Sequence, residues 1–253
     1  ELMFPVGSEY PKPEPLRVCY SSVLLKNRAV HFFGTADIEE PVQQWRDTKF
    51  ELTKSKWDYV FRRLFYCYTP DITKKPFSKW IELTNLDKTA GSAWALDVHQ
   101  AANGDIYLLW QETSTDSRLR DKYFPETKLI CAVRCAILRK GKIIKKFDIA
   151  KGGEGVESDE SPIWTRFHVT PNGRIFVFYS VNSSGTVKDR LREIYSNATV
   201  SKPVDIPLKH TYISNYFLIS PRSGSAPSNS IEVFGNCADT GNELRYARIR
   251  ILE

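Results

Sequence analysis

The chain has 253 residues, of which 42% are hydrophobic and 13% aromatic. This composition excludes an intrinsically disordered chain, and the length suffices for one large all-β domain or two smaller ones. The formal net charge is +6, from 36 basic and 30 acidic residues, and this mild excess favours anionic partners. No apolar run approaches the ~20 residues of a membrane span, and the basic residues are scattered. We therefore predict no membrane span and no nucleic-acid partner.

A strand–turn–strand unit returns four times along the chain. Each copy has an apolar-alternating run, a polar turn and a second run that is almost wholly apolar or aromatic. The copies cover Arg17–Gly34, Trp94–Trp110, Trp164–Tyr179 and Asn215–Gly235. Asn-Gly pairs in the second and third turns favour tight turns, because both residues tolerate positive φ. A supersecondary unit recurring along a chain is typical of a repeat architecture.

A second hairpin follows each of the first three units, whereas the last unit is followed by one run only, Leu244–Leu252. The sequence therefore predicts an all-β, single β-propeller domain over residues 1–253, with four blades of which the last has three strands. Glu1–Val6 is a candidate for the missing strand, although it contains Pro5. The predicted blades span residues 16–84, 94–150, 163–208 and 211–252.

Several alternatives to a closed four-bladed ring remain at this point. Five blades, or four blades within a larger ring, fit the same repeat, and so do an open β-sandwich and two stacked sheets. Residues 41–59 interrupt the first blade and are predicted as a helical or hairpin insert. Residues 151–161 are polar and acidic, and we interpret them as a solvated connection.

The sequence lacks the common catalytic motifs, so candidate residues come from aligning the repeats. His99 and His168 occupy equivalent positions before the turns, and Asp97 and Arg166 lie two residues before them, hence on the same strand face. We predict that these four side chains point toward a shared space on the propeller axis. The alternatives are a packed structural face, as apolar Val23 in the equivalent position indicates, and a metal site of two His and one Asp.

Other candidates are arginines, tryptophans and one strand tyrosine. Arginines recur near the third strand of several blades and could form a basic rim for carboxylate or sulfate groups, or a charged edge that prevents aggregation. Tyr179 is a candidate proton donor. The substrate-binding candidates besides Arg166 are Arg63, Arg120, Arg192, Arg245, Trp94 and Trp164.

The turns Asn103-Gly104-Asp105-Ile106-Tyr107 and Asn172-Gly173-Arg174-Ile175-Phe176 resemble those of the BNR-repeat, sialidase-like propellers. The resemblance covers about Arg17 to Leu252. Two segments, 180–186 and 238–244, echo the Asp-box of that group without its Trp. The group contains sialidases, other glycoside hydrolases, uronate-cleaving lyases and non-catalytic glycan binders, so the resemblance implies a carbohydrate-related function without choosing the chemistry.

We therefore expect a propeller that acts on an acidic oligo- or polysaccharide, as a polysaccharide lyase or a glycoside hydrolase. In a lyase, Arg166 would neutralise the uronate, His99 or His168 would take the α-proton and Tyr179 would protonate the leaving oxygen. Hydrolysis would need two carboxylates, with Asp97 and Glu112 as first candidates. The alternative is a non-catalytic glycan- or protein-binding propeller. We expect a secreted or periplasmic monomer without a cofactor, a structural metal ion being the open exception.

Overall fold

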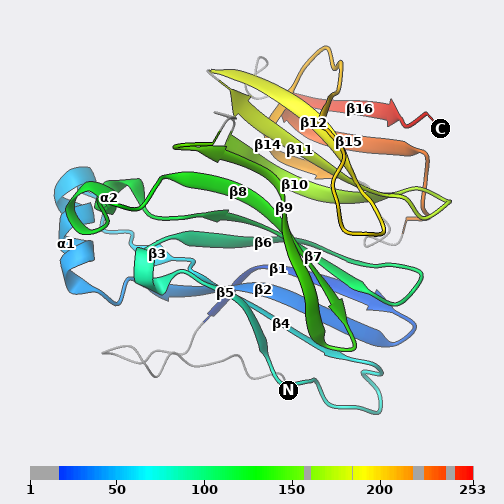
Figure 1. Cartoon of the computed structure of the whole chain (residues 1–253), viewed down its shortest axis with the longest axis horizontal. Helices are drawn as coiled ribbons and strands as arrows, with labels where there is room; N and C mark the ends of the chain where they lie inside the picture. Colours follow the sequence, from blue (N-terminus) through cyan, green and yellow to red (C-terminus); the bar gives the residue numbers. More distant parts are fainter. Residues whose placement is uncertain (1–16, 157–160, 184, 219–224, 238–242, 253) are drawn as a thin grey trace. The chain divides into compact units, whose positions relative to one another are not determined.

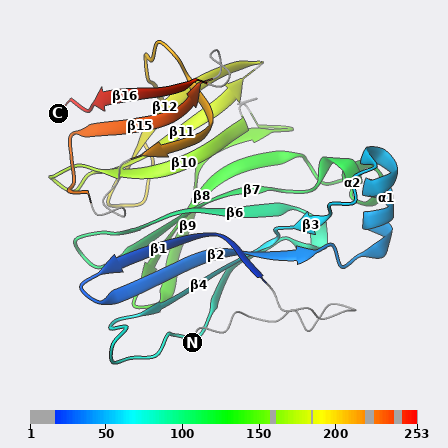
Figure 2. The same cartoon turned by 180° about the vertical axis from the view of Figure 1, so that it is seen from behind.

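The computed structural model describes residues 17–156, 161–183, 185–218, 225–237 and 243–252, which form four β-sheets (Figures 1 and 2). In each sheet the strands follow one another in chain order. Blade 1 contains β1 (Arg17–Lys26), β2 (Ala29–Glu39), β4 (Arg63–Thr69) and β5 (Ile81–Asn85), with the short β3 (Tyr59–Val60) paired to β2. Blade 2 contains β6 (Ser92–Gln100), β7 (Ile106–Thr113), β8 (Ile130–Arg139) and β9 (Lys142–Gly153).

The other two blades complete the predicted series. Blade 3 contains β10 (Ser161–Val169), β11 (Ile175–Ser183), β12 (Thr186–Ile194) and β13 (Val204–Asp205). Blade 4 contains β14 (Tyr212–Leu218), β15 (Ser230–Cys237) and β16 (Leu244–Arg250). The predicted four-blade, all-β organisation is confirmed, and the last blade has three strands among the described residues. The predicted strand at Glu1–Val6 lies outside the described residues.

The turns between the first and second strands have the backbone that their residues favour. Asn27 and Arg28 form a two-residue turn with φ of 49° and 67°. Gly104 and Gly173 have φ of 84° and 82°, and no atom beyond the adjacent residues lies within 4 Å of where their Cβ would be. Positive φ at these places explains why Asn and Gly mark the repeat.

Helices occupy two segments that connect strands. α1 (Gln43–Thr53) lies within the predicted insert at 41–59, which is therefore helical. α2 (Ser117–Tyr123) begins after Asp116, whose carboxylate accepts a hydrogen bond from the Arg118 amide at 2.9 Å. This helix lies between β7 and β8. A short 3-10 helix (Asp87–Thr89) precedes β6. No helix in the described part of the chain is long and apolar enough to span a membrane.

The chain divides into two compact units, which we describe separately. The first unit contains residues up to Ala95 and residues 112–130, and the second contains residues 96–111 and those from Cys131 onward. In the first unit α1 contacts α2, where Thr48 Oγ1 and Tyr123 Oη are 3.0 Å apart.

A buried ion-pair network anchors the α1 insert to blade 1. Glu40 accepts hydrogen bonds from Arg62 at 2.9 Å and from Lys49 at 2.8 Å, and the side chains of all three are at least 97% buried. Burial raises the pKa of Glu40, but the bonds from Arg62 and Lys49 outweigh it and lower the pKa. The Arg62 guanidinium also stacks on Trp45, 5.0 Å from the ring centroid. The charges are thus paired where desolvation would otherwise penalise them.

In the second unit, β11 is buried on both faces. Ile175, Val177 and Tyr179 belong to a core between blades 2 and 3, whereas Phe176 and Phe178 belong to a core between blades 3 and 4. Successive residues of a strand point to opposite faces. A strand packed on both sides must be apolar throughout, which explains the wholly apolar second run of this repeat.

Polar side chains link each blade to the first strand of the next. Thr35 Oγ1 accepts a hydrogen bond from the Ala95 amide at 2.9 Å, and Asp97 Oδ2 accepts one from the Phe167 amide at 3.0 Å. Asp189 Oδ2 accepts one from the Tyr212 amide at 2.7 Å. These bonds satisfy backbone groups that would otherwise be buried without a partner.

The link at Asp189 predicts a pH-dependent stability. Burial raises the pKa of this carboxyl to about 6, above its usual value near 4. A raised pKa contributes stability that is full below pH 4 and lost as the pH rises through 6, up to roughly 3 kcal/mol. In Asp189→Asn the amide oxygen can still accept from Tyr212, so the free energy of unfolding of the wild type relative to this variant should fall between pH 4 and pH 7. Urea denaturation at both pH values measures it, and a constant difference contradicts the assignment.

Candidate functional site

Asp97, predicted as a catalytic carboxylate, is buried and bonded to the backbone. Its Oδ1 accepts a hydrogen bond from the Val98 amide at 2.9 Å, and its Oδ2 accepts the bond from Phe167 described above. Asp97 is only 1% exposed. Asp97 therefore joins blade 2 to blade 3.

The two candidate histidines lie on different sides of β10. The His99 ring lies 6.3 Å from the Phe167 ring, whereas His168 Nε2 lies 2.7 Å from the Ser228 carbonyl oxygen. Phe167 and His168 are adjacent, so they point to opposite faces of the strand. Arg166 shares the face of His168. The expectation that Asp97, His99, Arg166 and His168 point into one shared space is therefore wrong, because β10 separates the two pairs.

Burial further limits two of the catalytic candidates. His168 is 2% exposed, and desolvation lowers its pKa. Tyr179 is also buried, in the core between blades 2 and 3. Neither side chain is placed to reach a polysaccharide. In the described ranges, no group of three or more His, Cys, Asp or Glu residues could hold a metal ion.

The arginines predicted as a basic rim are bonded within the chain. Arg63 pairs with Glu82 at 2.5 Å, Arg120 with Asp121 at 2.9 Å, and Arg245 with Glu243. Arg192 donates to the Ile149 carbonyl oxygen. Their guanidinium groups are therefore engaged, which fits the alternative that these residues form charged edges.

An aromatic cluster lies at the start of β1 and β6 in the first unit. The Tyr20, Phe61 and Trp94 rings contact one another pairwise, with centroids 4.7 to 5.5 Å apart. Tyr20 is 50% exposed and has φ of 49° at a β-bulge between Cys19 and Ser22. Positive φ is unfavourable for a bulky residue, and bulges often redirect a side chain beside a functional site.

A carboxylate lies near the same cluster. Burial, then the neighbouring Cys19, and then the charge of Asp37 raise the pKa of the Tyr20 phenol. Asp37 is half-buried and lies on β2, where it is the strand partner of Arg17. The first unit thus combines an exposed aromatic surface with an adjacent acid.

The same backbone device appears in the second unit at Trp164. This residue has φ of 41° at a bulge between Ile163 and Thr165, and it is 37% exposed. Two residues later, Arg166 is half-buried and donates to the Thr165 carbonyl oxygen at 2.9 Å. Trp94 and Trp164 were predicted from the sequence, whereas Tyr20 and Phe61 were missed. Tyr20 stands near the start of its repeat, as the two tryptophans do, and this position could have identified it.

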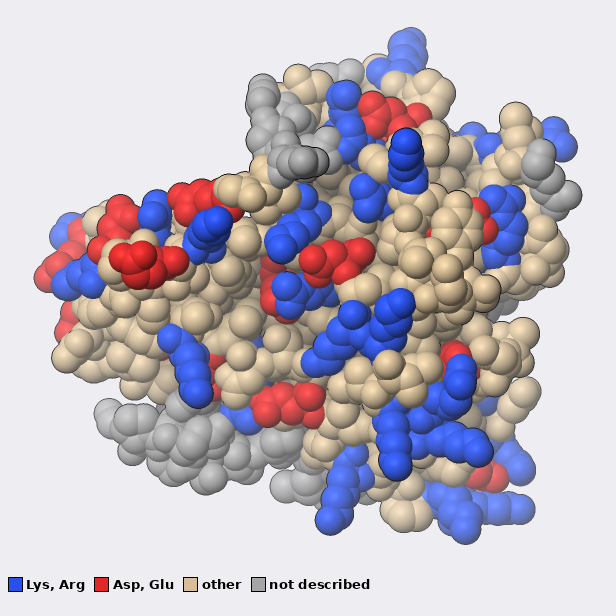
Figure 3. All heavy atoms as spheres, in the orientation of Figure 1, with Lys and Arg blue, Asp and Glu red and all other residues tan. Residues whose placement is uncertain are grey.

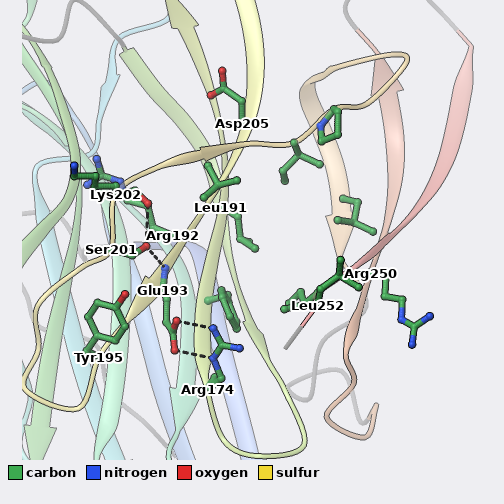
Figure 4. Close-up of a pocket in the computed structure, with 16 residues that line it drawn as sticks. Arg174, Leu191, Arg192, Glu193, Tyr195, Ser201, Lys202, Asp205, Arg250 and Leu252 are labelled. Carbon is green, nitrogen blue, oxygen red and sulfur yellow. Dashed lines mark hydrogen bonds and ion pairs between the residues drawn. The ribbon is translucent and has the colours of Figure 1, made fainter.

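A cavity of about 600 Å³ lies between blades 3 and 4 (Figure 4). Phe176, Leu191, Ile249 and Leu252 contribute apolar side chains to it, and Arg174 and Glu193 form an ion pair at one end, at 2.8 and 2.9 Å. Arg192, Lys202 and Arg250 also line the cavity, which therefore combines an apolar wall with basic side chains.

The carboxyl groups of this cavity are poorly suited to donate a proton. Hydrogen bonds from Arg174 lower the pKa of Glu193, and those from Arg190 lower the pKa of Asp205. A general acid needs a raised pKa at neutral pH. Asp189 has a raised pKa but is buried against Tyr212.

No protein-family model and no curated protein sequence matches this chain. Solved structures do match it. A protein of unknown function from Dyadobacter fermentans has a TM-score of 0.59 at 12% identity, covering 95% of this chain and 64% of that one. Zg3597, a family 117 glycoside hydrolase from Zobellia galactanivorans, has a TM-score of 0.51 at 18% identity, covering 92% and 66%.

RS223 β-xylosidase has a TM-score of 0.52 at 10% identity, covering 92% of this chain and 74% of that one. The chain thus spans just under two thirds of the length of the first two proteins. At these identities the similarity establishes the fold, a β-propeller, and leaves the chemistry open. The more specific resemblance to sialidase-like propellers stays a prediction.

The placement of Asp97 predicts that its removal affects stability. Asp97→Ala leaves buried amides without an acceptor and should lower the free energy of unfolding by about 1–3 kcal/mol, measured by urea denaturation. Asp97→Asn, which keeps an acceptor oxygen, should cost less. Asp148, whose ion pair with Arg134 is partly exposed, provides a matched control: Asp148→Ala should cost less than about 1 kcal/mol. An Asp97→Ala variant as stable as the wild type contradicts the structural role.

Proposed function

We propose that this chain is a carbohydrate-active β-propeller that contacts its glycan with the aromatic cluster of Tyr20, Phe61 and Trp94. The observation that carries the proposal is Tyr20, an exposed aromatic residue held at positive φ against Trp94. Strain of this kind persists where the surrounding structure enforces it, commonly at binding sites. Aromatic faces provide a rigid apolar surface, suited to the C–H faces of sugar rings, and the Tyr hydroxyl adds a polar group.

The fold supports a carbohydrate-related function without establishing it. Two of the proteins with similar folds are named as a family 117 glycoside hydrolase and a β-xylosidase. The same fold hosts different chemistries, so the residues of this chain must decide.

An anionic glycan is the substrate class that the charges favour. The net charge of +6 attracts anions over long distances. Arg166, close to exposed Trp164, donates from Nη1 to the Thr165 carbonyl oxygen, and its other guanidinium donors suit a sugar carboxylate. Extracellular location and a monomeric state accompany this proposal as predictions.

Hydrolysis is the reaction that we propose to test first. It requires two carboxyl groups flanking the bond, and Asp37 is the acid found beside the aromatic cluster. A second candidate is glycan binding without cleavage. Ion pairs lower the pKa of Glu40, Asp116 and Glu193. Carboxyl groups with a lowered pKa are poor general acids, and this favours binding without cleavage.

Affinity electrophoresis against xylan, arabinan, polygalacturonate and alginate tests the site. We expect the acidic polymers to retard the protein most. Trp94→Ala and Tyr20→Ala should weaken binding about tenfold or more, because they remove the central aromatic contacts. Trp57→Ala is a matched control, since Trp57 is an exposed tryptophan of the same unit outside the cluster. If all three variants bind like the wild type, the cluster is not the glycan site.

Product assays on the same polymers distinguish the reactions. New reducing ends without ultraviolet absorbance, lost in Asp37→Asn, support hydrolysis, whereas ultraviolet absorbance from unsaturated uronate supports elimination. Retention without either product supports the binding protein. A variant that loses binding must retain the wild-type unfolding midpoint before the loss is attributed to the site.

A further inference from the structure

In the described part of the chain, blade 4 ends in an open strand edge. β16 pairs with β15 from Ser230↔Arg250 to Asn236↔Leu244, and no strand pairs with its other side within the described ranges. The outer edge of such a strand presents backbone N–H and C=O groups that can pair with another chain.

The layer between blades 2 and 3 shows how a full set of strands fills such a region. There the twelve-residue β9 contributes Phe147 and Ile149, and Ala198 and Val200 follow β12 on the other side. Between blades 3 and 4, β13 has only two residues, and β16 is the outermost strand of blade 4 among the residues that the structure describes. The cavity of about 600 Å³ lies between β12–β13 and the end of β16.

We propose that the edge of β16 and this cavity bind an extended peptide in which large apolar residues alternate with acidic residues. The peptide would pair with β16 as an added strand, and its alternate side chains would enter the cavity, as Phe147 and Ile149 of β9 fill the neighbouring layer. The inference is independent of the proposed glycan site, which lies in the other unit.

Both blades provide apolar side chains that would contact the peptide. Leu191 of blade 3 and Leu252, which follows β16, both line the cavity (Figure 4). Phe176 of blade 3 and Ile249 of β16 line it too and belong to one hydrophobic cluster. Leu252 is 77% exposed, which is unfavourable for a leucine and is relieved when an apolar partner covers it. The Arg174–Glu193 pair closes one end and needs no partner charge.

The acidic residues of the proposed peptide are inferred from the charges of β16. Its seven residues include Arg245, Arg248 and Arg250. Arg245 and Arg248 pair with Glu243 and Glu232, whereas Arg250 is exposed and has no partner in the described part of the chain. An acidic residue opposite Arg250 would be stabilised as a cross-strand pair. A second copy of β16 contains no acidic residue that could pair with Arg250, so a separate acidic peptide is favoured over self-pairing. Lysine and arginine side chains also occur widely over one face of the molecule (Figure 3).

Fluorescence anisotropy with the full chain tests the proposal. The probe is a labelled synthetic peptide of seven residues, matching β16, in which glutamate alternates with phenylalanine and isoleucine. We expect saturable binding, and binding about tenfold weaker for a peptide of the same composition with the apolar residues grouped. Leu252→Asp should weaken binding about tenfold, because it places a charge in the apolar cavity. Leu25→Asp, at another exposed leucine, on β1, should leave binding unchanged.

A charge exchange identifies the contact to β16. Arg250→Glu should weaken binding of the acidic peptide about tenfold and strengthen binding of a peptide with lysine in place of glutamate. Backbone amide hydrogen exchange should slow in β16 when the peptide binds. Absent binding, or equal effects of Arg250→Glu on both peptides, overturns the proposal.

Two other segments could occupy the β16 edge and the cavity, and each would give a different experimental result. Either result overturns the proposal of a separate peptide partner. A concentration-dependent dimer in sedimentation that Leu252→Asp abolishes indicates a second copy. Peptide binding that appears only in Phe4→Asp indicates the N-terminal segment of this chain.

Discussion

Hydrogen bonds from the first strand of one blade to a polar side chain of the preceding blade are the interaction on which this structure depends. Thr35, Asp97 and Asp189 each accept such a bond from a buried amide. The sheets otherwise pack through apolar side chains, which are non-directional, so these bonds define the register between blades. They also explain why an acidic residue stands in an otherwise apolar strand. Its charge serves the backbone of the neighbouring blade and not a substrate.

The same packing places the candidate sites at the ends and edges of the sheets. Strands such as β11 are buried on both faces and leave no side chain for a ligand. Tyr20 and Trp164 reach solvent because a bulge turns each of them out of the strand alternation. The cavity beside β16 arises for a different reason, since the described residues of the last blade provide three strands where blades 2 and 3 have four. Backbone irregularity and incomplete pairing thus account for the accessible surfaces.

Much of the fold was predictable because it depends on local patterns. The four repeats, the turns at Asn27, Gly104 and Gly173 and the three-stranded last blade follow from alternation and positive φ. The candidate site was predictable only in part. Trp94 and Trp164 were identified, but His99 and His168 were assigned to one space although β10 separates them. Strand alternation gives the face of a side chain, but the neighbour of that face depends on how sheets stack.

The sequence by itself determined the all-β architecture, the number of repeats and the helical or hairpin nature of the insert at 41–59, since these depend on residues close together in the chain. Tertiary structure alone decided the partners of Asp97 and Asp189, the burial of Tyr179 and the cavity between blades 3 and 4. Each of these involves residues far apart in sequence. The sequence does not distinguish a buried structural aspartate from a catalytic one. The groups that surround the carboxylate decide whether it is desolvated beside a backbone partner or accessible to a ligand.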